Sequence, residues 1–230
     1  MASHDTGKGK FPGSDWAPRY KGQDTPPEAG DQLIDVYKLG YVDPTEDVAK
    51  EAAALQIYLP LRTTHLEERI RKQAQGEKWA IQPLLDVVGL RFDRPVHVKG
   101  SRLRHLIQTN IWWAVFHYKV QASRSRPWSQ TSINLYPIFQ RPDRLYPGHP
   151  SYPSGHATMA YTWALLLAKF HASKAPALLL AATEVAVNRE VAGVHFPSDK
   201  VCGLALGSEI AKQIYGKLTQ EQKGILSGKV

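Results

Sequence analysis

The sequence predicts an all-α protein built as a single-domain helical bundle. Apolar residues recur every three to four positions over most of the chain after residue 42, which is the spacing of amphipathic helices. The chain has 230 residues and shows neither an internal repeat nor a second domain, and this length suits one well-buried core but not two of ordinary size. Hydrophobic residues make up 43% and charged residues 22%, as in globular rather than disordered chains.

The N-terminal part of the chain has a different character from the rest. Residues 1–42 contain many Gly, Pro and charged positions with little periodicity, so we predict an irregular arm, flexible or draped over the body. Residues 43–230 form the helical domain in this interpretation. The arm carries apolar side chains that we expect to pack on the body: Trp16, Leu33, Ile34 and Tyr37.

The first helix is predicted to begin at Asp43, which can cap it, with Pro44 at its first position and Glu46 at its third. Pro60 is expected to end this helix, because proline cannot continue one. A charged helix then follows to about Gln75, and a short one covers Trp79–Gly89. The periodic apolar positions that support the first helix are Val48, Ala52, Leu55 and Tyr58.

The second half of the chain is predicted to hold four longer helices and one long loop. A helix covers Ser101–Ala122, and a segment from Pro127 to Pro153 is so rich in proline that no helix is expected there. A loop of this length in a compact domain is usually functional or disordered. The remaining three helices are expected at 155–171, 176–191 and 199–215.

Charge and composition narrow the function. The formal net charge of +8 suits anionic partners, although solubility alone would also explain it. No run of five basic residues is present, so we expect no nucleic-acid partner. The single cysteine, Cys202, excludes an internal disulfide framework and a multi-cysteine zinc site. No apolar stretch is long enough for a transmembrane segment and no signal peptide is visible. We therefore expect a soluble protein, cytoplasmic if the chain is complete and periplasmic or secreted if a signal peptide has been trimmed.

The first chemical motif is a lysine followed after six residues by Arg-Pro, at Lys119, Arg126 and Pro127. Lys119 is expected near the end of the long helix and Arg126 just beyond it. A helix end and the following turn can direct both cations into one cavity. A solvated basic helix end is the alternative interpretation of this motif alone.

The second motif is Tyr-Pro-Ser-Gly-His-Ala at 152–157, where the long loop meets an apolar helix. The backbone N–H groups of Gly155 and His156 are expected at the helix N-terminus, where unpaired donors and the helix dipole favour an anion. Ser154 can cap the helix or donate its hydroxyl to the same anion. Alone, this motif is equally compatible with a simple cap and a surface histidine.

The third motif reads Asn188-Arg189, then His195 and Asp199. Arg189 is expected on the last turns of one helix, His195 in the following turn and Asp199 at the start of the next helix. Asp199 can accept the ring N–H of His195 and leave the other ring nitrogen basic, as an activated histidine nucleophile requires. Asp199 can also cap its helix.

In this order and spacing the three motifs resemble the superfamily of type-2 phosphatidic acid phosphatases, class A acid phosphatases and vanadium haloperoxidases. The resemblance covers about residues 101–215 and implies the all-α bundle of that superfamily. One position departs from its signature: Asn188 stands where the family usually has serine, which puts the local hydrogen bonding in question.

The resemblance implies a metal-independent phosphatase that forms a phosphohistidine. His195 would be the nucleophile, Asp199 would orient it, and His156 would protonate the leaving oxygen and then activate water. No cofactor and no metal would be needed, because the protein supplies the positive charge. The groups expected to bind phosphate or vanadate are Lys119, Arg126, Ser154, Gly155 and Arg189.

Two alternatives remain open at this level. Vanadate has the shape of phosphate, so the same pocket would hold it with His195 as axial ligand in a vanadium-dependent haloperoxidase. A non-catalytic phosphate-binding protein is the further alternative. The substrate is expected to be a soluble phosphomonoester or a diphosphate, homo-oligomer formation stays open, and His149 can line the pocket. Aromatic side chains of the long loop would contact an organic leaving group or anchor the loop: Trp128, Tyr136, Phe139, Tyr146 and Tyr152.

Overall fold

The computed structural model describes residues 24–40, 42–44, 47–92, 97–129, 135–139 and 143–229. These residues form helices and connecting loops without any β-strand, so the predicted all-α fold class is confirmed. Eight α-helices are present in this part of the chain: α1 (Val48–Ala54), α2 (Thr64–Ala74), α3 (Glu77–Val88), α4 (Val98–Ala122), α5 (Gly155–Ala168), α6 (Ala175–Val191), α7 (Pro197–Lys217) and α8 (Gln220–Leu226). Short 3₁₀ helices add η3 (Ala29–Asp31), η4 (Val36–Lys38), η5 (Leu55–Leu61), η6 (Pro127–Ser129) and η7 (Ala172–Lys174).

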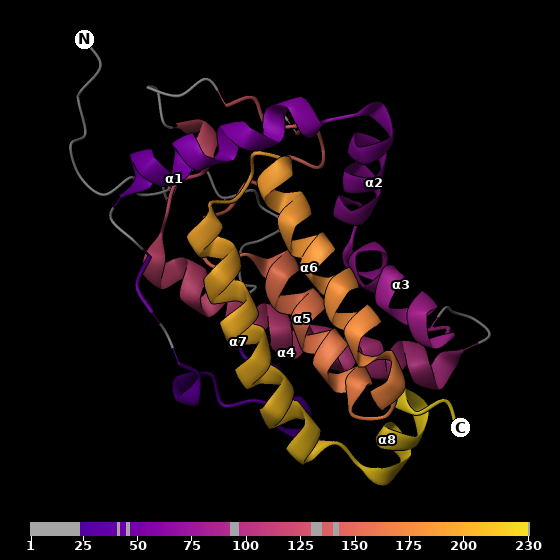
Figure 1. The fold of residues 1–230 in the computed structure, drawn as a ribbon. Helices are drawn as coiled ribbons and strands as arrows, with labels where there is room; N and C mark the ends of the chain where they lie inside the picture. Colours follow the sequence, from indigo (N-terminus) through magenta and orange to yellow (C-terminus); the bar gives the residue numbers. More distant parts are fainter. Residues whose placement is uncertain are drawn as a thin grey trace.

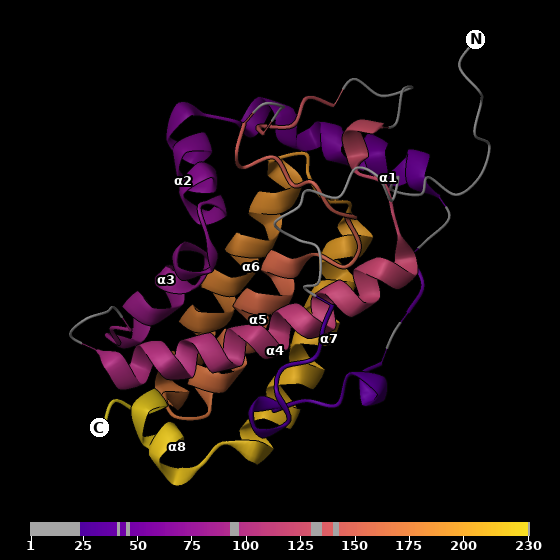
Figure 2. The same cartoon turned by 180° about the vertical axis from the view of Figure 1, so that it is seen from behind.

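Helix α5 lies at the centre of the bundle and packs against both α6 and α7 (Figure 1). The short connections between α5, α6 and α7 make neighbouring helices antiparallel, so α5 begins at the end of the bundle where α6 ends and α7 begins. Helix α4 crosses the opposite side of these helices (Figure 2). The α1–η5 segment, residues 48–61, lies across the end where α6 and α7 meet. This topology brings the second and third motifs to one end of the molecule.

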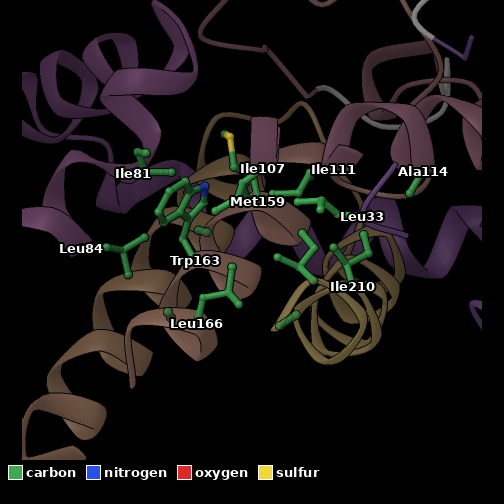
Figure 3. Packing of buried hydrophobic residues seen from close by; sticks show 14 of the residues in the cluster. Leu33, Ile81, Leu84, Ile107, Ile111, Ala114, Met159, Trp163, Leu166 and Ile210 are labelled. Atoms are coloured by element: carbon green, nitrogen blue, oxygen red, sulfur yellow. The ribbon is translucent and has the colours of Figure 1, made fainter. Parts of the chain in front are cut away.

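The main core lies where α3, α4, α5 and α7 meet (Figure 3). Trp163 of α5 is fully buried there and lies among side chains from its neighbours. Burying such side chains removes a large apolar area from water, at about 25 cal/mol per Å². The core side chains around Trp163 include Ile81, Leu84, Ile107, Ile111, Met159 and Ile210.

Helix α7 approaches α5 closely because two of its residues are glycines. A Cβ at Gly203 would lie 2.8 Å from the Ser154 carbonyl oxygen, and one at Gly207 would lie 2.7 Å from the Thr158 carbonyl oxygen. Backbone atoms cannot yield as a flexible side chain would, so larger residues would push α7 away from the N-terminal turns of α5. The backbone N–H of Ser154 donates to the Asp199 carbonyl at 2.9 Å. The glycines therefore hold the second motif against the third.

Residues 24–40 of the predicted arm lie against the body in part. Leu33 and Ile34 are buried in the main core, as expected. Tyr37 is 83% exposed, but its ring packs edge-on against His117 of α4 at a centroid distance of 5.5 Å. The backbone N–H of Leu33 donates to the Asn110 side chain at 2.7 Å, which attaches this part of the arm to α4. Trp16 lies outside the described residues, and the boundary at residue 42 stays a prediction.

Several predicted helix boundaries differ from the structure. Asp47, not Asp43, caps α1, because its carboxylate accepts the backbone N–H of Lys50 at 3.0 Å; Glu46 lies outside the described residues. After α1 the chain tightens into η5, and Pro60 is its penultimate residue. The proline-rich loop contains one helical turn, η6, in its described part. Helix α8 was missed, although Thr219 and Gln222 form the capping box that begins it.

Among the described residues, none of the helices combines the length and the apolar character needed to cross a bilayer.

Candidate active site

The second and third motifs meet at a cavity of about 280 Å³. Polar and cationic residues line it together with apolar ones. The polar part consists of Arg126, His149, Gly155, His156, Arg189 and His195. The apolar part includes Trp112, Phe116, Phe139, Leu145, Pro147 and Met159. Five of the eight residues predicted from the motifs line this cavity, although they come from positions up to 69 residues apart in the chain.

His195 lies in the turn between α6 and α7, with its ring oriented by two charged neighbours. Its Nδ1 lies 3.0 Å from Asp199 Oδ2, and its Nε2 lies 3.1 Å from Arg126 Nη1. Because a guanidinium nitrogen only donates, Nε2 is the acceptor and the ring proton is on Nδ1. Burial, followed by the charge of Arg126, lowers the pKa of His195 well below its usual value. The ring is therefore neutral with a basic Nε2, the form a nucleophile needs.

Asp199 holds His195 from the third position of α7. Its Oδ2 also accepts the backbone N–H of Phe196 at 3.0 Å, so the carboxylate both caps the helix and receives the ring N–H. The sequence had allowed either role, and the structure has both. Asp199 is fully buried, which makes these fixed donors necessary for a stable carboxylate.

Arg126 follows α4 and reaches the cavity through a dense set of hydrogen bonds. Its guanidinium donates to the carbonyl oxygens of His149, Pro150 and Val194 at 2.6–3.1 Å. These bonds fix the plane of the guanidinium group beside Nε2 of His195. The cation is thus already positioned before an anion binds, so binding costs no further conformational entropy of this side chain.

Arg189 lies on the last turn of α6 and faces the cavity from another side. Its Nη2 donates to the Ile70 carbonyl at 3.2 Å, and its guanidinium lies 5.8 Å from the centre of the Phe139 ring. Within the part of the chain that the structure describes, its buried Nε has no hydrogen-bond partner. Burial, followed by repulsion from Arg126, lowers the pKa of Arg189 to about 9. An unused donor on a buried cation is a favourable ligand for an anion oxygen.

His156 lies on the first turn of α5 and is held by α2. Its Nε2 donates to the Gln73 carbonyl at 3.3 Å. Asn188 donates in turn to the Gln73 side chain at 3.0 Å. The residue that departs from the family signature therefore supports His156 through Gln73. Burial, followed by the charge of Arg189, lowers the pKa of His156 to about 3, so the ring is neutral.

Ser154 and Gly155 form the N-terminus of α5, as predicted. Ser154 Oγ accepts the backbone N–H of Ala157 at 3.4 Å, and its hydroxyl proton can still be donated. A Cβ on Gly155 would lie 2.8 Å from the Trp112 ring, so only glycine allows α4 and α5 to approach here. Gly155 lines the cavity whereas Ser154 lies behind it, and anion binding by either residue stays a prediction.

Lys119 lies behind the cavity wall rather than in it. Its ammonium donates to the carbonyl oxygens of Pro150, Ser151 and Pro153 at 2.7–2.8 Å. These three bonds use all three of its protons and fix the loop that leads into α5. Burial lowers the pKa of Lys119 well below its usual value. Direct contact between Lys119 and phosphate stays a prediction, and its role in this structure is to anchor the loop.

The structure adds residues that motif analysis did not select. Arg124 forms ion pairs with both Asp199 and Glu51. Arg124 lies within the first motif, whereas Glu51 is far in sequence from all three motifs. Gly203 and Gly207 had a detectable signal, since small residues four apart mark a close helix contact. His149, which was expected to be near the pocket, lines it and contacts Arg126.

The aromatic residues of the long loop have different positions. Phe139 lines the cavity, so it can contact an organic group of a ligand. Tyr152 is buried and donates its hydroxyl to the Val42 carbonyl, and Trp128 packs against Tyr146. Tyr136 is 59% exposed. Of this group, one residue faces the cavity and three serve mainly to anchor the loop.

The neutral histidines predict acid sensitivity. Burial is the largest cause of the lowered pKa values of His149, His156 and His195. Below their usual pKa of 6.5 the unfolded chain binds protons that the native state excludes. The free energy of unfolding should therefore fall as the pH drops from 6.5, by up to about 1.4 kcal/mol per pH unit for each histidine. Urea unfolding at a series of pH values measures this slope. His156→Gln should make it shallower, and an equal slope in both proteins would contradict the assignment.

The fold and the cavity define an all-α protein with a cationic, histidine-bearing pocket. A family model described as the PAP2 superfamily matches residues 106–221, and the chain belongs to this superfamily. Curated relatives named decaprenylphosphoryl-5-phosphoribose phosphatase are 38% identical over 64 residues in Mycobacterium tuberculosis and 46% identical over 57 residues in Mycolicibacterium smegmatis. These matches cover 28% and 25% of this chain and 35% and 31% of the relatives, so the chain spans about a third of their length.

Two solved structures share the fold. A transmembrane PAP2-type phosphatidylglycerolphosphate phosphatase from Bacillus subtilis aligns with a TM-score of 0.52 and 18% identity, over 75% of this chain and 87% of that one. A bacterial vanadium-dependent iodoperoxidase aligns with a TM-score of 0.63 and 14% identity, over 95% of this chain and 62% of that one. The second alignment extends the likeness to most of the N-terminal half, which the family model does not match.

Proposed function

We propose that this protein is a phosphatase that hydrolyses a phosphomonoester or a diphosphate through a phosphohistidine on His195. The observation that carries the proposal is the pair of histidines in one cavity, one of them oriented by a buried aspartate. Both arginines of the site face the same cavity. Membership of the PAP2 superfamily and the phosphatase names of the curated relatives support this activity.

In the first step, Nε2 of His195 attacks phosphorus and the bond to the leaving oxygen breaks. The Nδ1–H···Asp199 contact of 3.0 Å stabilises the positive charge that develops on the ring. Arg126 Nη1 donates to Nε2 in the structure, and a bound phosphate oxygen would accept this N–H instead, which frees the lone pair of Nε2 for attack. Arg189 would bind a second oxygen with its unused Nε–H. The fork of arginine suits the equatorial oxygens of the transition state.

His156 would supply the proton for the leaving oxygen. Its pKa is low because the pocket is apolar and cationic, and a bound dianion would offset that charge and raise the pKa. After the alcohol departs, the neutral ring would accept a proton from water while the water oxygen attacks phosphorus. The phosphorus–nitrogen bond then breaks, and phosphate leaves with His195 neutral again. All charge compensation comes from side chains and backbone N–H groups, so we propose a mechanism without a metal or cofactor.

The cavity also bears on the substrate. Apolar side chains line it together with the cationic ones, which suits a phosphate ester that also carries a hydrophobic or aromatic group. The curated relatives are named for a substrate that combines a decaprenyl group with a phosphoribose. We therefore propose an organic phosphate or diphosphate that also carries an apolar group.

A vanadium-dependent haloperoxidase is the second candidate. The fold likeness to the iodoperoxidase over 95% of this chain favours it, and His195 would be the residue that binds vanadate through Nε2. Two assays on one preparation separate the candidates. We expect phosphate release from a panel of aryl, prenyl and sugar phosphates. Iodide or bromide oxidation with vanadate and peroxide, without any phosphate release, would overturn the phosphatase proposal.

The role of His156 predicts an effect that depends on the leaving group. With an alkyl phosphate, His156→Ala should lower turnover by about 100- to 10,000-fold, the usual contribution of general acid catalysis. With p-nitrophenyl phosphate the leaving oxygen needs little protonation, so the loss in phosphohistidine formation should be smaller. Single-turnover kinetics with both substrates measures the ratio. Equal losses would exclude His156 as the acid and indicate a structural role.

A further inference from the structure

We propose that Arg124, held by Glu51, is a positioning residue for His195 that acts through Asp199. The inference rests on the proposed function insofar as His195 is taken as the nucleophile. Arg124 does not line the cavity, so it is not a ligand of the substrate. Its side chain is 5% exposed and lies directly behind Asp199.

The two oxygens of Asp199 have separate partners. Oδ2 faces His195 Nδ1 and the backbone N–H of Phe196, both at 3.0 Å. Oδ1 accepts from Arg124 Nη1 at 2.8 Å. A carboxylate bound at one oxygen can rotate about χ2, whereas one bound at both oxygens has a fixed plane. Arg124 therefore determines the direction in which Oδ2 receives the proton of His195.

Arg124 is itself held from several sides. Its Nη1 also donates to Ser198 Oγ at 2.7 Å, and its Nη2 donates to Glu51 Oε2. The guanidinium lies 4.2 Å from the centre of the Phe196 ring, where an arginine is stabilised by the ring face. Phe196 precedes α7 directly and follows His195 in the chain. The same cation thus contacts Asp199 and both Phe196 and Ser198, which lie between His195 and Asp199 in the chain.

Glu51 links this arrangement to the N-terminal part of the chain. Its Oε1 accepts the backbone N–H of Ser198 at 2.7 Å and its Oε2 accepts Ser198 Oγ at 2.8 Å. A carboxylate at the first turn of α7 is favoured by the helix dipole. Glu51 belongs to α1, which lies across this end of the bundle (Figure 1) and outside residues 106–221 that match the superfamily. The α1 helix is therefore part of the apparatus that aligns the nucleophile.

The α1–η5 segment offers a matched control at a second contact. Tyr58 of η5 donates its hydroxyl to Glu190 Oε2 at 2.8 Å, and Glu190 is paired with Lys200 of α7 at 2.8 Å. This contact joins the same segment to α6 and, through Lys200, to α7 without touching Asp199. Tyr58→Phe removes one buried hydrogen bond and should weaken the attachment of the segment alone.

The test compares Arg124→Lys, Glu51→Gln and Tyr58→Phe with the wild type. Lysine keeps the charge but has one nitrogen in place of the two from which arginine bonds Asp199 and Glu51, so kcat should fall about 10- to 100-fold, as for other outer-layer partners of a functional histidine. KM should change less than about twofold, because Arg124 touches no part of the cavity. Glu51→Gln should give a smaller loss of kcat than Arg124→Lys. Tyr58→Phe should keep kcat within about twofold of the wild type, although its thermal midpoint should fall by an amount similar to that of the other two variants. Wild-type kcat in Arg124→Lys, or an equal loss in Tyr58→Phe, would overturn the proposal.

A second readout does not depend on activity. Arg126 keeps the His195 proton on Nδ1 in both proteins, but nuclear magnetic resonance spectra should show a downfield Nδ1–H signal in the wild type that moves upfield in Arg124→Lys, because the bond to Asp199 weakens. If the wild type hydrolyses no phosphate ester, the proposed function fails, and the spectra alone decide whether Arg124 orients His195. An unchanged His195 signal in the folded Arg124→Lys protein would then refute the positioning role. A changed signal would support it for whatever chemistry the pocket performs.

Discussion

Replacing His195 by alanine is expected to lower turnover on the order of 10,000-fold or more, because removal of a nucleophile leaves only binding and electrostatic stabilisation. The variant should keep its fold. Asp199 would lose one partner, but Arg124 and the backbone N–H of Phe196 still satisfy its carboxylate. Turnover, the far-ultraviolet spectrum and phosphate binding should be measured on the same sample.

Rapid quenching gives the positive counterpart of this experiment. The wild type should yield an acid-labile phosphoryl group on His195, and the alanine variant should yield none. His105→Ala is the matched control, because His105 is exposed and does not line the cavity. More than a few per cent of residual activity in a folded His195→Ala protein would assign the nucleophile elsewhere.

Arg189→Ala should produce the second large effect, with opposite consequences for binding and stability. Loss of one preorganised donor to a developing anion costs about 100- to 1,000-fold in rate. The same change removes a buried cation that repels Arg126. The described contacts of this cation are the Ile70 carbonyl oxygen and the Phe139 ring. The thermal midpoint without ligand should therefore be unchanged or higher, since an unpaired buried charge is costly.

Ligand-induced stabilisation measures the binding side of this prediction. Phosphate or vanadate at about 100 times its Kd should stabilise the wild type by about 2.7 kcal/mol. Arg189→Ala should largely lose this shift, and Arg189→Lys should recover only part of it because an ammonium lacks the fork. Arg69→Ala is the control, since Arg69 forms an exposed pair with Glu184. A full shift in Arg189→Ala, or no shift in the wild type, would refute the anion site.

The sequence by itself determined the fold class and indicated the polar residues that line the cavity. Helical periodicity defined the long helices to within a few residues, because apolar spacing is a local property that tertiary packing reinforces. The three motifs identified His156, Arg126, Arg189 and His195, since each stands at a helix end where chemistry and local backbone geometry coincide. The pairing of His195 with Asp199 was also predictable, because residues four apart across a helix start are neighbours whatever the rest of the chain does.

Only the tertiary structure decided which charges face the cavity and which support it. Lys119 and Arg126 read alike in the sequence, yet Lys119 bonds loop carbonyls while Arg126 contacts His195. Arg124 and Glu51 are 73 residues apart, and Gln73 and Asn188 are 115 apart. No local pattern encodes such pairs, because they form when separate helices bury polar groups that must then find partners. The long-range contacts that orient the two histidines therefore depend on how α1 and α2 dock on α6 and α7.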